Sequence, residues 1–354
     1  MKILIIGAGP TGLSTALDLA QNGIVPEIVE KRTEPSAFSR AVGIMPFTRD
    51  HLKKSGAADA ILKEGMPFRK FVINRESKTL LDLDLSKVLK PEECMIGLPQ
   101  NRTESLIAEA AEALGVTVRY GTELTKIETT DHTAAATFSD GSMNSYDWVI
   151  AADGKDSTTR TQLDISYRGI DLPETWSIAD VDVGEGYDPE QLRLWIQGKD
   201  GLFILVLPIE QQRLRIVSST ADCLEDMPIK MDIRNVRRTG TFSISVRQAA
   251  TYKKGRVLLA GDAAHCHSPV GGRGMNLGID DGFSVSQAIL GNTVENYTET
   301  RHRIGASVLK KTENARKMMT SESTVDKLLL NAAFGLLRHS ELLQRKLIKE
   351  LTTF

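Results

Sequence analysis

The chain has 354 residues, of which 41% are hydrophobic and 25% are charged. This composition is typical of a globular protein, and the length allows about two domains. The net charge of -2 gives no electrostatic basis for binding nucleic acid, and no apolar run reaches the roughly 18 residues that span a bilayer. Cys94, Cys223 and Cys266 are too widely spaced for a disulfide framework, so we expect a reducing, cytoplasmic setting.

Residues 3–30 are typical of a strand–helix–strand unit that binds a dinucleotide. An apolar run is followed by Gly7, Gly9 and Gly12, spaced as G-x-G-x-x-G. The first glycine permits a tight turn, the second lets a pyrophosphate approach the backbone, and the third lets the helix pack on the strand. Glu30 ends the next strand about 18 residues past Gly12, near the spacing of a ribose-binding carboxylate, which favours FAD or NAD. A secretory signal is the less specific alternative for the first twenty residues.

The middle of the chain predicts an antiparallel sheet. Alternating segments between residues 168 and 251 read as strands, and the hairpin that starts at residue 70 is expected to join them. Trp195 and Phe203 are candidates for lining a substrate pocket, although a core position explains them at least as well. The amphipathic C-terminal segment is expected to pack over either domain, with a membrane surface as the alternative.

Two further strand ends carry glycine and aspartate. The strand over residues 148–151 leads to Asp153-Gly154, and the strand over residues 257–260 leads to Gly261-Asp262. Because ligands of open α/β sheets bind at the carboxyl ends of the strands, we expect one long dinucleotide to touch all three glycine-bearing ends. An ordinary turn between strand and helix is the local alternative for Asp153-Gly154.

Taken together, the motifs resemble the class A flavoprotein monooxygenases, the para-hydroxybenzoate hydroxylase-like family, and most of all its polyketide-type aromatic hydroxylases. No single motif decides the resemblance, but their order does. The matching segments are GAGPTG at 7–12, SRAVGI at 39–44, LPQNRTESLI at 98–107, ADGKDSTTR at 152–160 and GDAAHCHSPVGGRGMNLGIDD at 261–281.

The resemblance implies where FAD is held. Gly7, Gly9 and Gly12 would contact the pyrophosphate, and Glu30 the adenosine ribose. The other residues implied are Arg40, Gln100 and Arg102 near the phosphates and ribityl chain, Asp153 and Gly154 in a second fingerprint, Gly261 and Asp262 at the cofactor hydroxyls, and Pro269, Gly271, Gly272, Gly274, Met275 and Asn276 along the isoalloxazine ring. Pro269 and Gly272 are the candidates for a catalytic position beside that ring.

The glycine-rich segment over residues 261–281 has two other interpretations. Its His-Cys-His triplet at 265–267 could bind a metal, but no third and fourth ligand is evident nearby, so we expect no metal. An irregular loop without a ligand is the second. The bare backbone of residues 271–274 favours a flat ring lying against the chain, with the next helix N-terminus facing its negative edge. Arg273 departs from the resemblance, because a glutamine is common there.

The expected fold class is α/β, with a Rossmann-like FAD-binding domain of the glutathione-reductase type. It is interleaved with a substrate domain on an antiparallel sheet, and C-terminal helices follow. The expected ranges are 1–70, 98–166 and 253–300 for the FAD-binding domain, 71–97 and 167–252 for the substrate domain, and 301–354 for the helices. Because the chain ends at Phe354, we expect no thioredoxin-like third domain.

The resemblance implies an FAD-dependent, NAD(P)H-consuming monooxygenase. It would hydroxylate an aromatic or polyketide-like small molecule with dioxygen, through a flavin C4a-hydroperoxide. The alternatives are an FAD-dependent oxidase, reductase or halogenase, and a binding protein on the same fold without redox chemistry. The intact Asp153-Gly154 and Gly261-Asp262 motifs argue against the binding protein.

Overall fold

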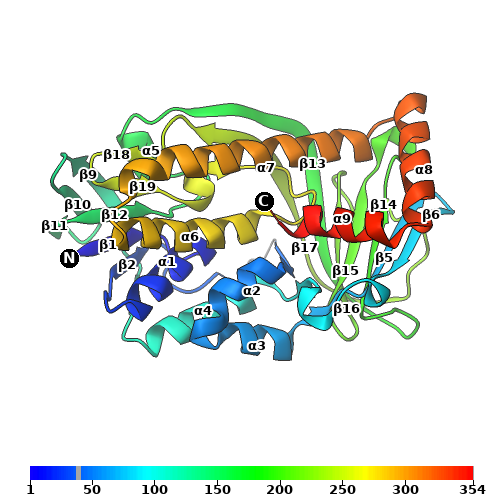
Figure 1. Ribbon diagram of the computed structural model, residues 1–354, viewed down its shortest axis with the longest axis horizontal. Helices are drawn as coiled ribbons and strands as arrows, with labels where there is room; N and C mark the ends of the chain where they lie inside the picture. Colours follow the sequence, from blue (N-terminus) through cyan, green and yellow to red (C-terminus); the bar gives the residue numbers. More distant parts are fainter. Residues whose placement is uncertain (37–40, 354) are drawn as a thin grey trace.

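The computed structural model describes residues 1–36 and 41–353. Figure 1 shows two units side by side, one built on a mainly parallel sheet and one on a mainly antiparallel sheet. Helix α7 (Tyr297–Met319) runs along both units. This arrangement confirms the expected α/β fold class with C-terminal helices. In the described part of the chain, no helix is long and apolar enough to cross a membrane.

The parallel sheet forms because short runs of branched apolar residues become buried on both faces. Its order is β18-β19-β12-β1-β2-β8, and only the β18–β19 pair is antiparallel. Its strands are β1 (Ile3–Ile6), β2 (Glu27–Glu30), β8 (Val118–Tyr120), β12 (Trp148–Ala151), β18 (Lys253–Lys254) and β19 (Val257–Leu259). The β1 and β12 residues are all buried, as the sequence pattern predicts.

Helices and two small sheets surround this parallel sheet. Helix α1 packs against α6 and α4, and α2 packs against α3 and α6. The helices of this unit are α1 (Pro10–Gln21), α2 (Pro46–Leu52), α3 (Ala57–Glu64), α4 (Gln100–Glu112), α5 (Thr158–Gln162) and α6 (Gly274–Leu290). The small sheets are β11-β10-β9 (Met143–Tyr146, Ala134–Phe138, Leu124–Thr129) and β3-β7-β4 (Gly43–Ile44, Ile96–Gly97, Met66–Pro67).

The second unit is a sheet in the order β20-β17-β13-β16-β15-β14-β5-β6. Its strands are β5 (Lys70–Arg75), β6 (Lys78–Asp84), β13 (Tyr167–Val183), β14 (Gln191–Trp195), β15 (Ile204–Glu210), β16 (Arg213–Ser218), β17 (Ile233–Ala249) and β20 (His265–Cys266). The early hairpin β5–β6 joins this sheet through a parallel pairing of β5 with β14, which confirms that prediction. The long strands β13 and β17 extend from this sheet toward the parallel one (Figure 1).

The two faces of the antiparallel sheet bury different apolar clusters. One cluster contains Trp176, Phe203 and Val270, and helix α8 (Thr324–Arg338) packs on it through Phe334. We call this side the α8 face. The opposite cluster contains Trp195 and lies beneath the segment that follows β16. Helix α9 (Glu341–Thr352) follows α8 and packs against it.

Candidate functional site

A cavity of about 230 Å³ lies where β1, β2 and β12 end. Its lining includes Gly7, Gly9, Glu30, Asp153 and Gly154. Gly7 and Asp153 are 146 positions apart in the chain, and the parallel pairing of β1 with its two neighbours brings these residues together. The cavity therefore occupies the strand ends where α/β sheets bind ligands.

Two glycines of the first motif permit close packing. A Cβ atom on Gly7, whose φ is +100°, would lie 2.4 Å from the Ala152 carbonyl oxygen, and one on Gly12 would lie 1.9 Å from the Gly7 carbonyl oxygen. Both contacts are far below van der Waals distance, so any side chain would push the turn, helix α1 and the end of β12 apart. These positions accept only glycine.

Two other glycines leave bare backbone open to the cavity. No atom lies within 4 Å of a Cβ built on Gly9 or on Gly154. Gly9 is also the N-cap of α1 and supplies no side-chain acceptor, so the positive end of the helix borders the cavity. The open backbone and the helix terminus can accommodate a pyrophosphate, so the residues at this site fit the pyrophosphate of FAD.

Glu30 is buried and anionic. Its Oε2 accepts a hydrogen bond from the Ala8 N–H at 2.9 Å, and its Oε1 accepts one from Arg32 Nε at 3.0 Å. Burial by itself would raise the pKa of Glu30, but the hydrogen bonds from Arg32 and Ala8 bring it below its ordinary value. Glu30 thus fixes the glycine turn to the end of β2. Its predicted contact with ribose stays a prediction, and Arg32 shares the same carboxylate.

Asp153 is engaged in capping the helix that follows it. Its carboxylate accepts hydrogen bonds from Ser157 Oγ at 2.6 Å, from the Thr159 N–H at 3.0 Å and from Thr159 Oγ1 at 2.8 Å. These bonds satisfy donors at the start of α5. The structure therefore gives Asp153 a local role in shaping the cavity wall beside Gly154.

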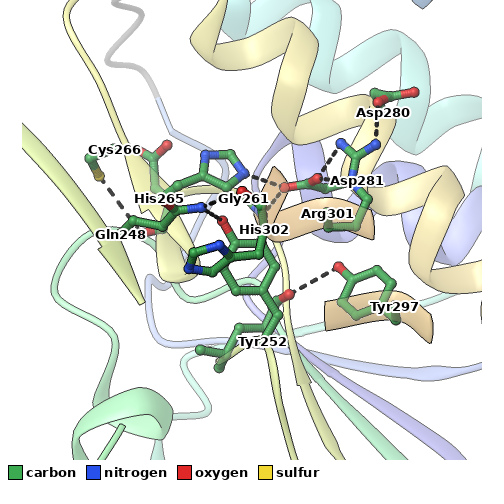
Figure 2. Close-up of polar contacts among 12 residues, drawn as sticks. Gln248, Tyr252, Gly261, His265, Cys266, Asp280, Asp281, Tyr297, Arg301 and His302 are labelled. Carbon is green, nitrogen blue, oxygen red and sulfur yellow. Dashed lines mark hydrogen bonds and ion pairs between the residues drawn. The ribbon is translucent and has the colours of Figure 1, made fainter. Parts of the chain in front are cut away.

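A buried carboxylate, Asp281, holds Gly261, which follows strand β19, in place (Figure 2). It accepts hydrogen bonds from the Gly261 N–H at 2.9 Å and from Arg301 Nε at 2.6 Å, and it lies 2.6 Å from His265 Nε2. Burial would raise the pKa of Asp281, but Arg301 and His265 hold it well below its usual range. Asp281 is fully buried, so its charge is balanced only by these neighbours.

The same arginine extends the network to two more elements. Arg301 of α7 also bonds Asp280 at 2.7 Å, and Asp280 lies 2.9 Å from Nε2 of His51 in α2. The His51 ring stacks on Phe283 of α6 at 4.6 Å between centroids. Sequence reasoning assigned none of these residues a role, because the two aspartates looked like part of a helix. The signal lay in adjacent acids on an otherwise buried helix, which need a cation nearby.

The His-Cys-His triplet turns its side chains to different partners. His265 binds Asp281, Cys266 Sγ donates to the Asp262 carbonyl oxygen, and Nδ1 of His267 lies 2.8 Å from the Ser268 carbonyl oxygen. Burial lowers the pKa of His267 to about 4. Within residues 1–36 and 41–353, no group of His, Cys, Asp and Glu is arranged to hold a metal.

The loop over residues 269–274 has the backbone that its glycines suggest. Gly271 and Gly272 have φ values of +88° and +62°, and no atom lies within 4 Å of a Cβ built on Gly272. Pro269 accepts a hydrogen bond from the Gly272 N–H at 2.9 Å, and α6 begins at Gly274. We call this segment the glycine loop. Its open face suits a flat ring, and contact with flavin stays a prediction for it and for Met275.

Asn276 connects the glycine loop to another loop. Its Nδ2 donates to the carbonyl oxygens of Gly43 and Gly272 at 2.8 and 3.0 Å. Its Oδ1 accepts from the Met45 N–H at 2.9 Å and from Thr48 Oγ1 at 2.7 Å. All four capacities of this amide are used within the protein. Its side chain therefore positions the loops, whatever its backbone contacts.

The remaining predicted cofactor residues are placed less directly. Arg40 lies outside the described residues. Gln100 Oε1 accepts from the Ala41 N–H at 3.2 Å, and Asp262 is exposed at the turn after Gly261. Arg102 forms ion pairs with Glu64 and Glu109 at the protein surface and is absent from the lining of the cavity. Cofactor contact by these residues stays a prediction.

The two candidate substrate residues lie on opposite faces of the sheet. Phe203 is on the α8 face, with its ring centroid 5.5 Å from that of Trp176. Trp195 is 3% exposed and belongs to the opposite cluster, away from Val270 of the glycine loop. The packing of Trp195 favours the core interpretation, whereas Phe203 belongs to the same apolar cluster as Val270 of the glycine loop.

The glycine turn, the buried acid after β2 and the cavity at three strand ends define a dinucleotide-binding flavoprotein. The chain belongs to the FAD-binding family, whose model, described as an FAD binding domain, matches residues 1–239 and 220–312. Its cofactor is therefore FAD, as the sequence predicts.

Two of the most similar relatives are named as monooxygenases. The chain is 29% identical over 348 residues to the uncharacterized aromatic compound monooxygenase YhjG of Bacillus subtilis, covering 90% of this chain and 68% of that one. It is 26% identical over 376 residues to 6-methylpretetramide 4-monooxygenase of Streptomyces rimosus, covering 98% and 67%. These relatives confirm the predicted class of enzyme, a flavin-dependent monooxygenase.

Solved structures share the fold over almost the whole chain. The p-nitrophenol 4-monooxygenase PnpA of Pseudomonas putida has a TM-score of 0.86 at 22% identity and covers 99% of this chain and 98% of its own. The anhydrotetracycline hydroxylase OxyS of Streptomyces rimosus has a TM-score of 0.78 at 26% identity, covering 99% and 75%.

Proposed function

We propose that this enzyme hydroxylates an aromatic or polyketide-like small molecule, with NAD(P)H as the electron donor and dioxygen as the oxygen source. The observation that carries the proposal is the aromatic α8 face of the sheet. Trp176 lies 5.5 Å from Phe203 and 6.3 Å from Phe242 between ring centroids, and the cluster reaches the glycine loop through Val270. An aromatic compound held there would lie beside the open loop backbone.

The residues of the chain would divide the work of binding and orientation. Gly9, Gly154 and the N-terminus of α1 would hold the pyrophosphate, and Gly272 would lie against the ring. When bound and reduced by NAD(P)H, FAD supplies the activation of dioxygen that hydroxylation needs. The α8 face would orient the substrate and exclude water, which protects a reactive oxygen species from unproductive loss.

The proposed domains follow the two sheets except at β20, which pairs with β17 but lies in the range proposed for the FAD-binding domain. We assign residues 1–70, 98–166 and 253–300 to the FAD-binding domain, 71–97 and 167–252 to the substrate domain, and 301–354 to the C-terminal helices. The enzyme would act in the cytoplasm, which the free thiols of Cys94, Cys223 and Cys266 support.

The proposal is tested by measuring three linked quantities with a panel of phenolic and polycyclic aromatic compounds. NAD(P)H oxidation should be slow without substrate and much faster with a suitable compound. Dioxygen uptake should match it, and the product should carry one oxygen atom from ¹⁸O₂ by mass spectrometry. If the best compound is dehydrogenated instead, or if the inserted oxygen comes from water, the enzyme is not a hydroxylase of that compound.

A further inference from the structure

The guanidinium of Arg273, a residue of the glycine loop, reaches the end of helix α9. Its Nη1 donates to the Thr353 carbonyl oxygen at 2.7 Å, and its Nη2 donates to the Glu350 carbonyl oxygen. Arg273 is 5% exposed and immediately precedes α6, so the C-terminus of the described chain lies beside the start of α6 (Figure 1). The last carbonyls of a helix have no partner within it and carry partial negative charge, which a buried cation satisfies well.

A second arginine holds the same helix pair near its middle, where α8 ends. Arg338, the last residue of α8, donates to the Leu80 carbonyl oxygen of β6 at 2.6 Å. Arg75 of β5 donates to Asn331 Oδ1 of α8 at 3.1 Å. Helices α8 and α9 are therefore attached to the antiparallel sheet through α8 and to the glycine loop through the end of α9. We call this helix pair, residues 324–352, the helical cover.

The helical cover closes the α8 face. Phe334 belongs to the same buried cluster as Trp176 and Phe203, and Leu330 and Leu337 of α8 pack against it. Trp176 and Phe203 are only 1% and 3% exposed. An aromatic compound can therefore reach Trp176 and Phe203 only if the packing around them opens, and α8 is part of that packing.

Apolar packing alone does not fix the orientation of α8. Its buried side carries the residues just named, but its outer side exposes Val325, Leu328, Leu329 and Leu336 as well. Because the hydrophobic effect is not directional, a helix that is apolar on both sides can pack through either. The hydrogen bonds of Arg273 and Arg338 to backbone oxygens are directional, so they select one arrangement.

We propose that Arg273 is a positioning residue that fastens the helical cover to the glycine loop, so that closure over the substrate and placement of the loop occur together. Val270 contacts the buried cluster, and Arg273 holds α9 three positions further along the same loop. Release of the arginine frees the end of α9 and opens the α8 face. The identity of the substrate rests on the proposed function. The attachment of α9 to the glycine loop by Arg273 does not depend on that function.

The test compares Arg273→Gln, which removes the charge and the two-pronged donor, with Arg273→Lys, which keeps a cation. Arg119→Gln is the control, because Arg119 forms ion pairs with Glu27 and Asp140 on the surface of the other unit. Hydrogen–deuterium exchange is measured over residues 341–353 of the FAD-loaded enzyme without substrate. We expect exchange at least about tenfold faster in Arg273→Gln, equivalent to about 1.4 kcal/mol, a smaller change in Arg273→Lys and none in Arg119→Gln.

Steady-state kinetics distinguish the loss of this attachment from a general loss of structure. We expect Arg273→Gln to raise KM for the aromatic substrate and the hydrogen peroxide formed per NAD(P)H, with a smaller effect on kcat. If Arg273→Gln is insoluble, Arg273→Lys carries both measurements, with partial effects expected. Unchanged exchange over α9, or loss of FAD affinity with KM unchanged, overturns the proposal. If no aromatic compound is hydroxylated, the proposed function fails. The exchange data still test whether Arg273 attaches α9 to the glycine loop.

Discussion

Replacing the buried carboxylate of Asp281 by an amide of the same size should cost the protein a large part of its stability. Asp281→Asn removes the charge that balances Arg301 and replaces an acceptor of the Gly261 N–H and His265 by a group that also donates. Breaking a buried ion pair by removing one partner costs about 3–5 kcal/mol. Arg301 keeps its bond to Asp280, so we take the lower end, about 3 kcal/mol. At about 2–4 °C per kcal/mol, the midpoint of thermal unfolding falls by about 6–12 °C.

The assay is thermal unfolding followed by circular dichroism, with Asp182→Asn as the matched control. Asp182 also binds two arginines, Arg213 and Arg237, but at the surface, where water replaces lost partners. We expect little change in the control. Asp281→Asn should also weaken FAD binding, because Gly261 loses its anchor. Equal shifts in the two variants, or a shift below about 1 °C for Asp281→Asn, would refute the view that this carboxylate organises the site.

The remaining predictions concern pH, cofactor binding and metal. Because the folded-state pKa of Asp281 is depressed, its stabilisation is complete above the ordinary carboxyl pKa of about 4 and is lost only as the pH falls below it; the gap in unfolding midpoint between parent and Asp281→Asn should stay constant from pH 5 to 8 and shrink in stronger acid. Gly12→Ala should abolish or greatly weaken FAD binding in a fluorescence titration, since its Cβ would lie 1.9 Å from the Gly7 carbonyl oxygen; parental affinity would contradict this packing. Asp262→Ala should weaken FAD binding by about 5- to 150-fold, the equivalent of about 1–3 kcal/mol, and unchanged affinity would remove Asp262 from the site. A chelator should leave turnover intact, and one zinc or iron per chain in elemental analysis would reverse that expectation.

Local sequence patterns were sufficient for the first unit of the fold. The turn at Gly7, the start of α1 and the position of Glu30 follow from spacing and steric limits within thirty residues, and the structure confirms the strand–helix–strand order. The hairpin that joins the antiparallel sheet was also predictable, because its alternation and turn are local. These features depend on neighbours along the chain.

Features set by distant partners were not predictable in the same way. The alternation predicts strands over residues 176–183, 191–197, 202–209 and 213–219 but none over β17 (Ile233–Ala249), because the charged and glycine-containing first half of β17 resembles a loop until it pairs with β13. The role of Asp281 depends on Arg301 and His265 meeting it inside the fold. Arg102 matched a motif, but two glutamates nearby give it a surface position.

The interleaving of the two sheets also means that one strand of the parallel sheet is synthesised long before one of its partners. Strand β12 pairs with β1 at Ile3 and Trp148, but its other neighbour, β19, pairs at Val149 and Val257. About 100 residues separate β12 from β19. Ribosomes add about 5–20 residues per second, so this edge of β12 has no partner for roughly 5–20 s. During this time a strand edge that is buried in the folded protein lacks its partner, and unpaired apolar edges of this kind favour aggregation.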